Sequence, residues 1–194
     1  MRIGIEINGV LRDTLKKIQE VYTKWNIENP YKEDNEKGEV FSDLTSLEIS
    51  KHLKFTNDNE LYDFLYKEYT MEIFGHAGSV EYTSMNDLND FYLDFREKFD
   101  ILVVSDELGK SKPASLFFLS KFGCLIETVK FYSESTIQSL WDSVDILLTA
   151  NPNLLLNHPS NKTVIKYKTT YNSDIEVAHE ITSIKELKEK IENI

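Results

Sequence analysis

The chain has 194 residues, of which 33 are acidic and 22 are basic, so its formal net charge is −11 at pH 7. This length is enough to bury a full hydrophobic core, and it predicts one domain or one domain with an inserted subdomain. The acidic balance, without any dense run of Lys and Arg, argues against nucleic-acid binding, which needs clustered cations.

Cysteine content and hydropathy exclude two further classes of protein. The sequence has one cysteine, Cys124, so it can form no intrachain disulfide. No apolar run approaches the length of a membrane span, and the first residues do not form a charged and then apolar leader. We therefore expect a cytoplasmic protein with no membrane partner, while the sequence leaves its oligomeric state open.

The first predicted element is a strand over residues 2–7. It is rich in Ile, alternates in polarity as strands do, and carries Glu6 with Asn8 and Gly9 just after it. The Asn8-Gly9 pair alone would favour a hairpin. The residues that follow have apolar side chains at helical spacing, which indicates that the turn leads into a helix; these are Leu15, Ile18, Tyr22 and Trp25.

Residues 14–80 form a predicted helical insertion with no convincing strand. Residues 27–40 are polar and read as a loop. One helical pattern then begins after the cap candidate Ser42, and a second runs from Asn57 to a stop at Gly75. We therefore predict a small helical cap over residues 14–80 and a core made of residues 1–13 and 81–194.

The rest of the chain alternates between helices and strands. Ser84 and Asp87 have capping-box spacing before a predicted helix that leads into the buried strand "DILVVSD". Later strands are predicted in "TVKFYS", "VDILLTA" and "KTVIKY", and Ser183 with Glu186 caps the last helix. Five strands alternating with helices predict an α/β fold, with a mostly parallel five-stranded sheet covered on both faces. Its ligand site should lie at the carboxyl ends of the strands.

Three sequence motifs at these strand ends resemble those of a known family. "IEINGVLRDT" is similar to the first motif of the haloacid dehalogenase (HAD) superfamily, hydrophobics-D-x-D-G-V-L-x-D, as found in its 5'(3')-deoxyribonucleotidases. "ILVVSDE" resembles the second motif, and "VDILLTANPN" resembles the strand that ends in two aspartates. The resemblance spans nearly the whole chain. It implies a HAD-like Rossmannoid core with a cap inserted after the first strand, and the activity of a Mg²⁺-dependent phosphatase.

The residues at the catalytic positions of these motifs differ from the family pattern. Glu6 stands where the resemblance places the nucleophilic Asp, with its carboxylate about 1 to 1.5 Å further from the backbone. Asn8 stands at the acid/base position, and an amide exchanges no proton near neutral pH. Thr149 and Ala150 replace the aspartate pair that holds Mg²⁺, an ion that prefers charged oxygens. We therefore expect a degenerate site without a metal cofactor.

A second alignment of the later motifs leaves an active enzyme possible. It places "YSES" on a metal-binding motif, so that Glu134 and Glu6 would hold Mg²⁺ and Lys112 would hold the phosphate. We prefer the first alignment, because it alone supplies five strands in the family order. Ser105, Gly9 and Lys112 are the candidate ligand- or phosphate-binding residues, although Ser105 could equally cap a turn.

These observations lead to two hypotheses for the function. The first is a pseudo-phosphatase that binds a nucleotide-like ligand or a protein partner. The second is an active metal-dependent phosphatase or 5'-nucleotidase that uses Glu6. Aromatic side chains of the cap could stack on a base or form the core of the cap; they are Tyr62, Phe64, Tyr66, Tyr69 and Phe74. Asp145 is expected at the end of the sheet away from the site, and Asn172 is expected to organise a loop near the last strand.

Overall fold

The computed structural model describes residues 1–28 and 49–194, and its centre is a parallel sheet. The sheet has six strands in the order β3-β2-β1-β4-β5-β6, and every neighbouring pair is parallel. The strands are β1 (Arg2–Glu6), β2 (Asp100–Asp106), β3 (Val129–Tyr132), β4 (Ile146–Thr149), β5 (Thr163–Tyr167) and β6 (Glu180–Ile181). The predicted α/β class is confirmed. The predicted count of five strands is wrong, because β6 has two residues and is too short to show a strand pattern.

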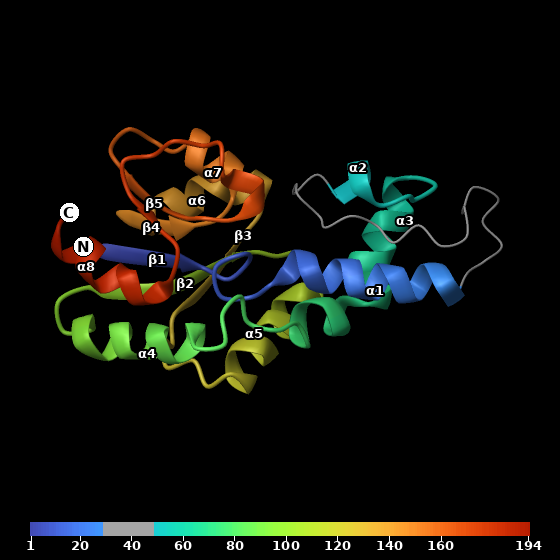
Figure 1. Ribbon diagram of the computed structural model, residues 1–194, viewed down its shortest axis with the longest axis horizontal. Helices are drawn as coiled ribbons and strands as arrows, with labels where there is room; N and C mark the ends of the chain where they lie inside the picture. Colours follow the sequence, from blue (N-terminus) through green and yellow to red (C-terminus); the bar gives the residue numbers. More distant parts are fainter. Residues whose placement is uncertain (29–48) are drawn as a thin grey trace.

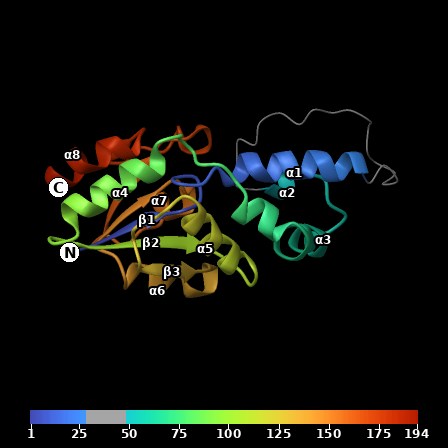
Figure 2. The ribbon, with the colours of Figure 1, turned by 90° about the horizontal axis from the view of Figure 1, so that it is seen from below.

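Helices cover both faces of this sheet, as Figures 1 and 2 show. One face packs against α4 (Ser84–Phe95), α5 (Ser111–Lys121) and α8 (Leu187–Glu192), and the other packs against α6 (Ile137–Trp141) and α7 (Pro152–Leu156). Residues of β2 alternate between the two cores, with Val103 in the first and Val104 in the second. Burial on both faces is the reason that the strand sequences read as continuous apolar runs.

The helical segment after β1 packs around a hydrophobic cluster of its own. It contains α1 (Thr14–Glu28), α2 (Ile49–His52), α3 (Asp58–Asp63) and two π-helical turns, Phe64–Glu68 and Met71–Gly75. Their apolar side chains surround Tyr22, Trp25 and Phe64, and the cluster also takes in Ala114 of α5. Figure 1 shows this segment beyond the carboxyl ends of β1 and β2. We refer to it as the cap, and the domain boundaries at residues 14 and 80 stay a prediction.

The two predicted cap helices differ from the structure in detail. The second begins as predicted, since the Asn57 side chain accepts a hydrogen bond from the Glu60 amide at 3.1 Å, and it ends at Gly75. It is not one continuous α-helix, because the two π-helical turns interrupt it. The predicted start of the first helix at Ser42 lies outside the described residues, as does most of the predicted loop over 27–40.

The chain enters and leaves the cap along adjacent paths. The Asp13 amide donates to the Gly78 carbonyl at 3.0 Å, and the Val80 amide donates to the Leu11 carbonyl at 3.1 Å. These hydrogen bonds hold the two linking segments side by side and fix the cap against the end of β1. No helix within the described ranges is long and apolar enough to cross a membrane.

The predicted cap at Ser84 is wrong, and the predicted cap at Ser183 is right in position but lacks the side-chain bond, since Ser183 is the N-cap of the 3-10 turn that leads into α8. Ser84 lies inside the first turn of α4, where its hydroxyl bonds to the backbone of Glu81 rather than to that of Asp87. The Ser183 hydroxyl donates to the Glu81 carboxylate, and Thr182 is the residue that bonds to Glu186. Spacing alone cannot separate neighbouring candidates for a cap. Short 3-10 turns complete the fold at Glu134–Thr136, Thr170–Asn172 and Ile184–Glu186.

Candidate functional site

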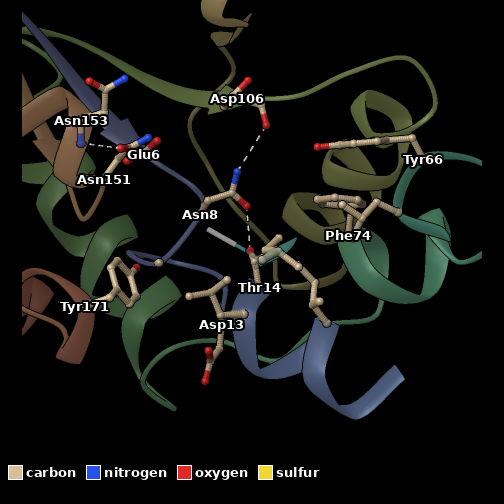
Figure 3. Close-up of a pocket in the computed structure, with 15 residues that line it drawn as sticks. Glu6, Asn8, Asp13, Thr14, Tyr66, Phe74, Asp106, Asn151, Asn153 and Tyr171 are labelled. Carbon is tan, nitrogen blue, oxygen red and sulfur yellow. Dashed lines mark hydrogen bonds between the residues drawn. The ribbon is translucent and has the colours of Figure 1, made fainter. Parts of the chain in front are cut away.

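A pocket of about 330 Å³ lies where the carboxyl ends of β1, β2 and β4 meet the cap. Its walls come from both parts of the molecule, as Figure 3 shows. The core supplies polar side chains and the cap supplies apolar and aromatic ones; they include Glu6, Asn8, Asp106 and Asn151 from the core and Leu65, Tyr66 and Phe74 from the cap. This is the edge of the sheet at which parallel α/β folds bind ligands.

Glu6, at the end of β1, is a buried carboxylate whose two oxygens both accept hydrogen bonds. Its side chain is 1 % exposed. Oε1 accepts from the Tyr132 hydroxyl at 2.6 Å, and Oε2 accepts from the Thr149 hydroxyl. Burial raises the pKa of Glu6 to about 7, although the hydrogen bonds from Thr149 and Tyr132 act in the opposite direction. The carboxylate is therefore held by the protein itself and is poorly placed to attack a phosphorus atom.

Asn8 connects the β1 loop to its neighbours through both ends of its amide. Its Oδ1 accepts from Arg12 Nη2 at 2.6 Å and from Thr14 Oγ1 at 2.7 Å. Its Nδ2 donates to Ser105 Oγ at 3.3 Å and to the Asp106 carbonyl at 3.4 Å. Figure 3 shows the bonds of Asn8 to Thr14 and to Asp106. An amide can satisfy donors and acceptors at once, so Asn8 suits this linking position better than a carboxylate would.

A fully buried ion pair underlies the pocket. Arg12 and Glu107 have side chains that are 0 % exposed, and their charged atoms lie 2.7 Å apart. Arg12 Nη1 also donates to the Phe74 carbonyl of the cap at 2.7 Å and to Ser115 Oγ at 2.5 Å. Burial lowers the pKa of Arg12, and the Glu107 carboxylate raises it. The pair joins core and cap within a region that water does not reach.

Sequence reasoning missed both members of this ion pair. Arg12 lies at a variable position of the first motif, and Glu107 follows the second motif. The sequence did contain one signal of a buried charge, because Arg12 and Glu107 each lie inside or next to an apolar run. Charged side chains are seldom fully buried unless they are paired, so each of them required a partner. The spacing did not show that the two would meet, because the whole cap, α4 and β2 lie between them in the sequence.

The residues at the expected metal position do not fit Mg²⁺. The Thr149 hydroxyl already donates to Glu6, Ala150 has no oxygen in its side chain, and the Asn8 oxygen is bound by the Arg12 cation. Within residues 1–28 and 49–194, no group of three His, Cys, Asp or Glu side chains gathers to hold a metal ion. A hard divalent cation needs several anionic oxygens that are free to turn toward it.

The alternative metal ligand Glu134 lies at the same edge of the sheet, near Asp106, but two strands away from Glu6. It follows β3, which is separated from β1 by β2, and its side chain is exposed. In contrast, β4 pairs directly with β1, so Thr149 meets Glu6. The order of the strands therefore supports the alignment in which Thr149 and Ala150 occupy the positions of the aspartate pair.

The candidate phosphate-binding residues do not form an anion site. The Ser105 hydroxyl donates to Glu107 Oε1 at 2.9 Å inside the buried network. Lys112 is exposed at the start of α5, with its ammonium 6.0 Å from the centre of the Phe131 ring, and it does not line the pocket. Gly9 does line the pocket, at φ +74°, where a Cβ would overlap the Tyr171 hydroxyl.

Backbone amides of the β1 loop are also engaged. The amides of Ile7 and of residues 9–14 all donate to backbone carbonyl groups, at distances between 2.9 and 3.4 Å. Phosphate sites at such loops depend on amides that point toward the ligand. This loop instead closes its hydrogen bonds on itself and on the linking segment at Gly78.

Two predicted structural residues lie where the sequence placed them. Asp145 accepts from the Arg2 amide at 2.8 Å, at the end of the sheet away from the pocket. Asn172 is buried, accepts from the Thr169 amide at 2.8 Å and donates to the carbonyl groups of Ala150 and Tyr167, both at 2.9 Å. Asn172 thus ties the loop after β5 to the end of β4, as predicted.

Comparisons with known proteins bear on the fold. No protein-family model and no curated protein matches the chain. Solved structures do match. A HAD-superfamily hydrolase of subfamily IA from Geobacter sulfurreducens has a TM-score of 0.62 at 10 % identity, and covers 100 % of this chain and 98 % of its own. A haloacid dehalogenase-like hydrolase from Burkholderia xenovorans has a TM-score of 0.64 at 11 % identity. The match covers 99 % of this chain and 96 % of that one.

A third similar structure is a magnesium-bound HAD hydrolase from Bacillus subtilis, with a TM-score of 0.56 at 10 % identity, covering 100 % of this chain and 98 % of its own. All three align with this chain over essentially the full length. At these identities the likeness concerns the path of the backbone and not the chemistry of the site. The chain therefore has the fold of the haloacid dehalogenase-like hydrolases.

Proposed function

We propose that this protein is a catalytically degenerate HAD-fold protein, a pseudo-phosphatase that acts by binding a ligand in the pocket between core and cap. The observation that carries the proposal is the state of Glu6. Both of its oxygens accept hydrogen bonds from hydroxyl groups, and its side chain is 1 % exposed. A nucleophilic carboxylate must reach the reacting atom, and this one is fixed by two hydroxyl groups and almost fully enclosed.

Three other features of the pocket support the loss of hydrolysis. Asn8 is fixed by Arg12 and Thr14 and exchanges no proton, so an acid/base is lacking at that position. The donor set does not fit Mg²⁺. The backbone amides of Ile7 and of residues 9–14 donate to carbonyl groups, so they are not directed at a transferring phosphoryl group. A metal ion and preorganised donors supply most of the catalysis in phosphoryl transfer.

Ligand binding is the role that the remaining geometry suits. The pocket is concave, and Tyr66 and Phe74 form one stacked wall with ring centres 5.6 Å apart and planes 14° apart. Such a wall accepts a flat, base-like group, which favours a small molecule with an aromatic ring over a protein partner. Asn8, Asn151 and Asn153 place amide groups around the same space.

The test is phosphate release by the full chain. Substrates are p-nitrophenyl phosphate and a panel of deoxynucleoside monophosphates, each with Mg²⁺ or Mn²⁺ at millimolar concentration. We expect no release above that of heat-denatured protein, and no metal-dependent rise in melting temperature. Turnover that Glu6→Ala abolishes would overturn the proposal and establish an active phosphatase that uses Glu6. The matched control is Asp90→Asn, an exposed change on α4 away from the pocket.

A further inference from the structure

We propose that the ligand of this pocket is a flat aromatic molecule that carries a positively charged amino group and no phosphate. This inference rests on the proposed ligand-binding function and names the chemical class of the ligand. It follows from three properties of the pocket. These are the sign of its charged groups, the shape of its apolar wall, and the fact that the loop amides of Ile7 and residues 9–14 already donate to backbone carbonyl groups.

The charged side chains among the described residues that line the pocket are all carboxylates. They are Glu6 at the end of β1, Asp106 at the end of β2 and Asp13 before α1. No described Lys or Arg lines the pocket, and Arg12 beneath it is already paired with Glu107 at 2.7 Å. Glu6 is enclosed by hydroxyl groups, and Asp13 lies beside Lys16. The negative charge that a ligand meets in the pocket is therefore chiefly that of Asp106, and this charge repels a phosphate monoester.

Asp106 is the carboxylate best placed to meet a ligand. Its backbone carbonyl accepts from Asn8, whereas no described residue donates a hydrogen bond to its carboxylate oxygens. Loss of hydration and the nearby carboxylates of Glu107 and Glu134 raise its pKa to about 6. An ammonium group of a ligand beside Asp106 would supply the positive charge that no described Lys or Arg lining the pocket supplies.

The opposite wall accounts for the aromatic part of the ligand. The rings of Tyr66 and Phe74 are nearly parallel, with centres 5.6 Å apart, and Leu65, Leu15 and Ile18 continue the apolar surface. In Figure 3 these rings face Asn8 and Asp106 across the open space. A ligand with a flat body on the rings would thus direct its polar end toward the carboxylate. The volume of about 330 Å³ is at the lower end of the range for small-molecule sites.

The experiment compares three probes by isothermal titration calorimetry with the full chain at pH 7.5. Tryptamine carries an indole ring and an ammonium group, tryptophol replaces the ammonium with a hydroxyl, and AMP carries a phosphate on an aromatic base. We expect tryptamine to bind roughly two- to fivefold more tightly than tryptophol, the effect of one partly exposed ion pair. AMP should bind more weakly than either.

Variants assign this preference to the pocket. Asp106→Asn should reduce tryptamine affinity to that of tryptophol and leave tryptophol unchanged. Asp90→Asn removes the same charge from the exposed face of α4 and should change neither affinity. Phe74→Leu should weaken tryptamine and tryptophol equally, because it removes a ring and no charge.

The results separate this inference from the proposed function. Equal binding of tryptamine and tryptophol, or no binding of tryptamine at millimolar concentration, would overturn the inference. Tighter binding of AMP without release of phosphate would also overturn it, and would leave the pseudo-phosphatase proposal standing. Release of phosphate from AMP would overturn the proposed function itself.

Discussion

Removing one partner of the buried Arg12–Glu107 pair should destabilise the protein more than any other single charge change described above. In Glu107→Ala, the Arg12 guanidinium stays enclosed with its positive charge uncompensated. It keeps its bonds to the Phe74 carbonyl at 2.7 Å and to Asn8 at 2.6 Å, and it loses the ionic contact at 2.7 Å. The side chains of both partners are 0 % exposed, so water cannot replace the missing charge without opening the interface between core and cap.

The expected loss follows from the burial of the pair. Breaking a buried ion pair by removing one partner costs about 3–5 kcal/mol, because an unpaired charge remains in the interior. A domain of this kind has a free energy of unfolding of about 5–15 kcal/mol, so the variant should lose about a fifth or more of its stability. In Arg12→Met with Glu107→Leu neither charge remains, and we expect a coupling energy of about 2–3 kcal/mol between the two changes.

Urea denaturation at pH 7, followed by far-UV circular dichroism, measures these free energies. The control is Lys188→Met, which breaks a surface pair with Asp94 at 2.7 Å in which both side chains are about half exposed. That change should cost less than about 1 kcal/mol. If Glu107→Ala costs no more than Lys188→Met, then Arg12 and Glu107 are not held in a dry interior, and the account of the site given above is wrong.

Three further changes test other parts of the site. Glu6 has a folded pKa of about 7 against an ordinary value of 4.5, so the native state binds its proton more strongly than the unfolded chain does. The free energy of unfolding should therefore fall by about 3 kcal/mol as the pH rises from 4.5 to 7. In Glu6→Gln, the free energy measured by urea titration should not show this part of the decrease. Gly9→Ala should lower the melting temperature, because φ is +74° and a Cβ would overlap the Tyr171 hydroxyl; Tyr171→Phe should recover part of the loss. Asn172→Ala should cost about 2–3 kcal/mol in urea denaturation, since it leaves a buried amide and two carbonyl groups without partners; an equal loss in the exposed control Asn161→Ala would contradict this.

Much of the core could be predicted from the sequence, because strands buried on both faces leave strong local patterns. The runs around Val103 and Leu147 are apolar throughout, and helices with apolar stripes separate them. β6 could not be predicted, since two residues show no periodicity. The π-helical turns at Phe64–Glu68 and Met71–Gly75 were also missed, because their apolar spacing resembles that of an α-helix.

The candidate site was predicted in position but not in its interactions. Motif spacing placed Glu6, Asn8 and Thr149 at one edge of the sheet, where they now lie. It did not show that the Glu6 carboxylate would be enclosed by hydroxyl groups or that Arg12 would bind Asn8, because these contacts depend on side chains from distant segments. Long-range polar contacts carry no local sequence signal, and they decide here whether a motif residue is available for chemistry.

The hydrogen bonds of Glu6 and Asn8 also bear on how this pocket can change over evolutionary time. Shortening Glu6 to Asp would draw the carboxylate away from the Tyr132 hydroxyl, now 2.6 Å distant. Replacing Asn8 with Asp would set an acceptor against the Asp106 carbonyl, to which the amide now donates. Under the proposed function, each single change to Asp would therefore remove a hydrogen bond of the folded state before any activity could be selected.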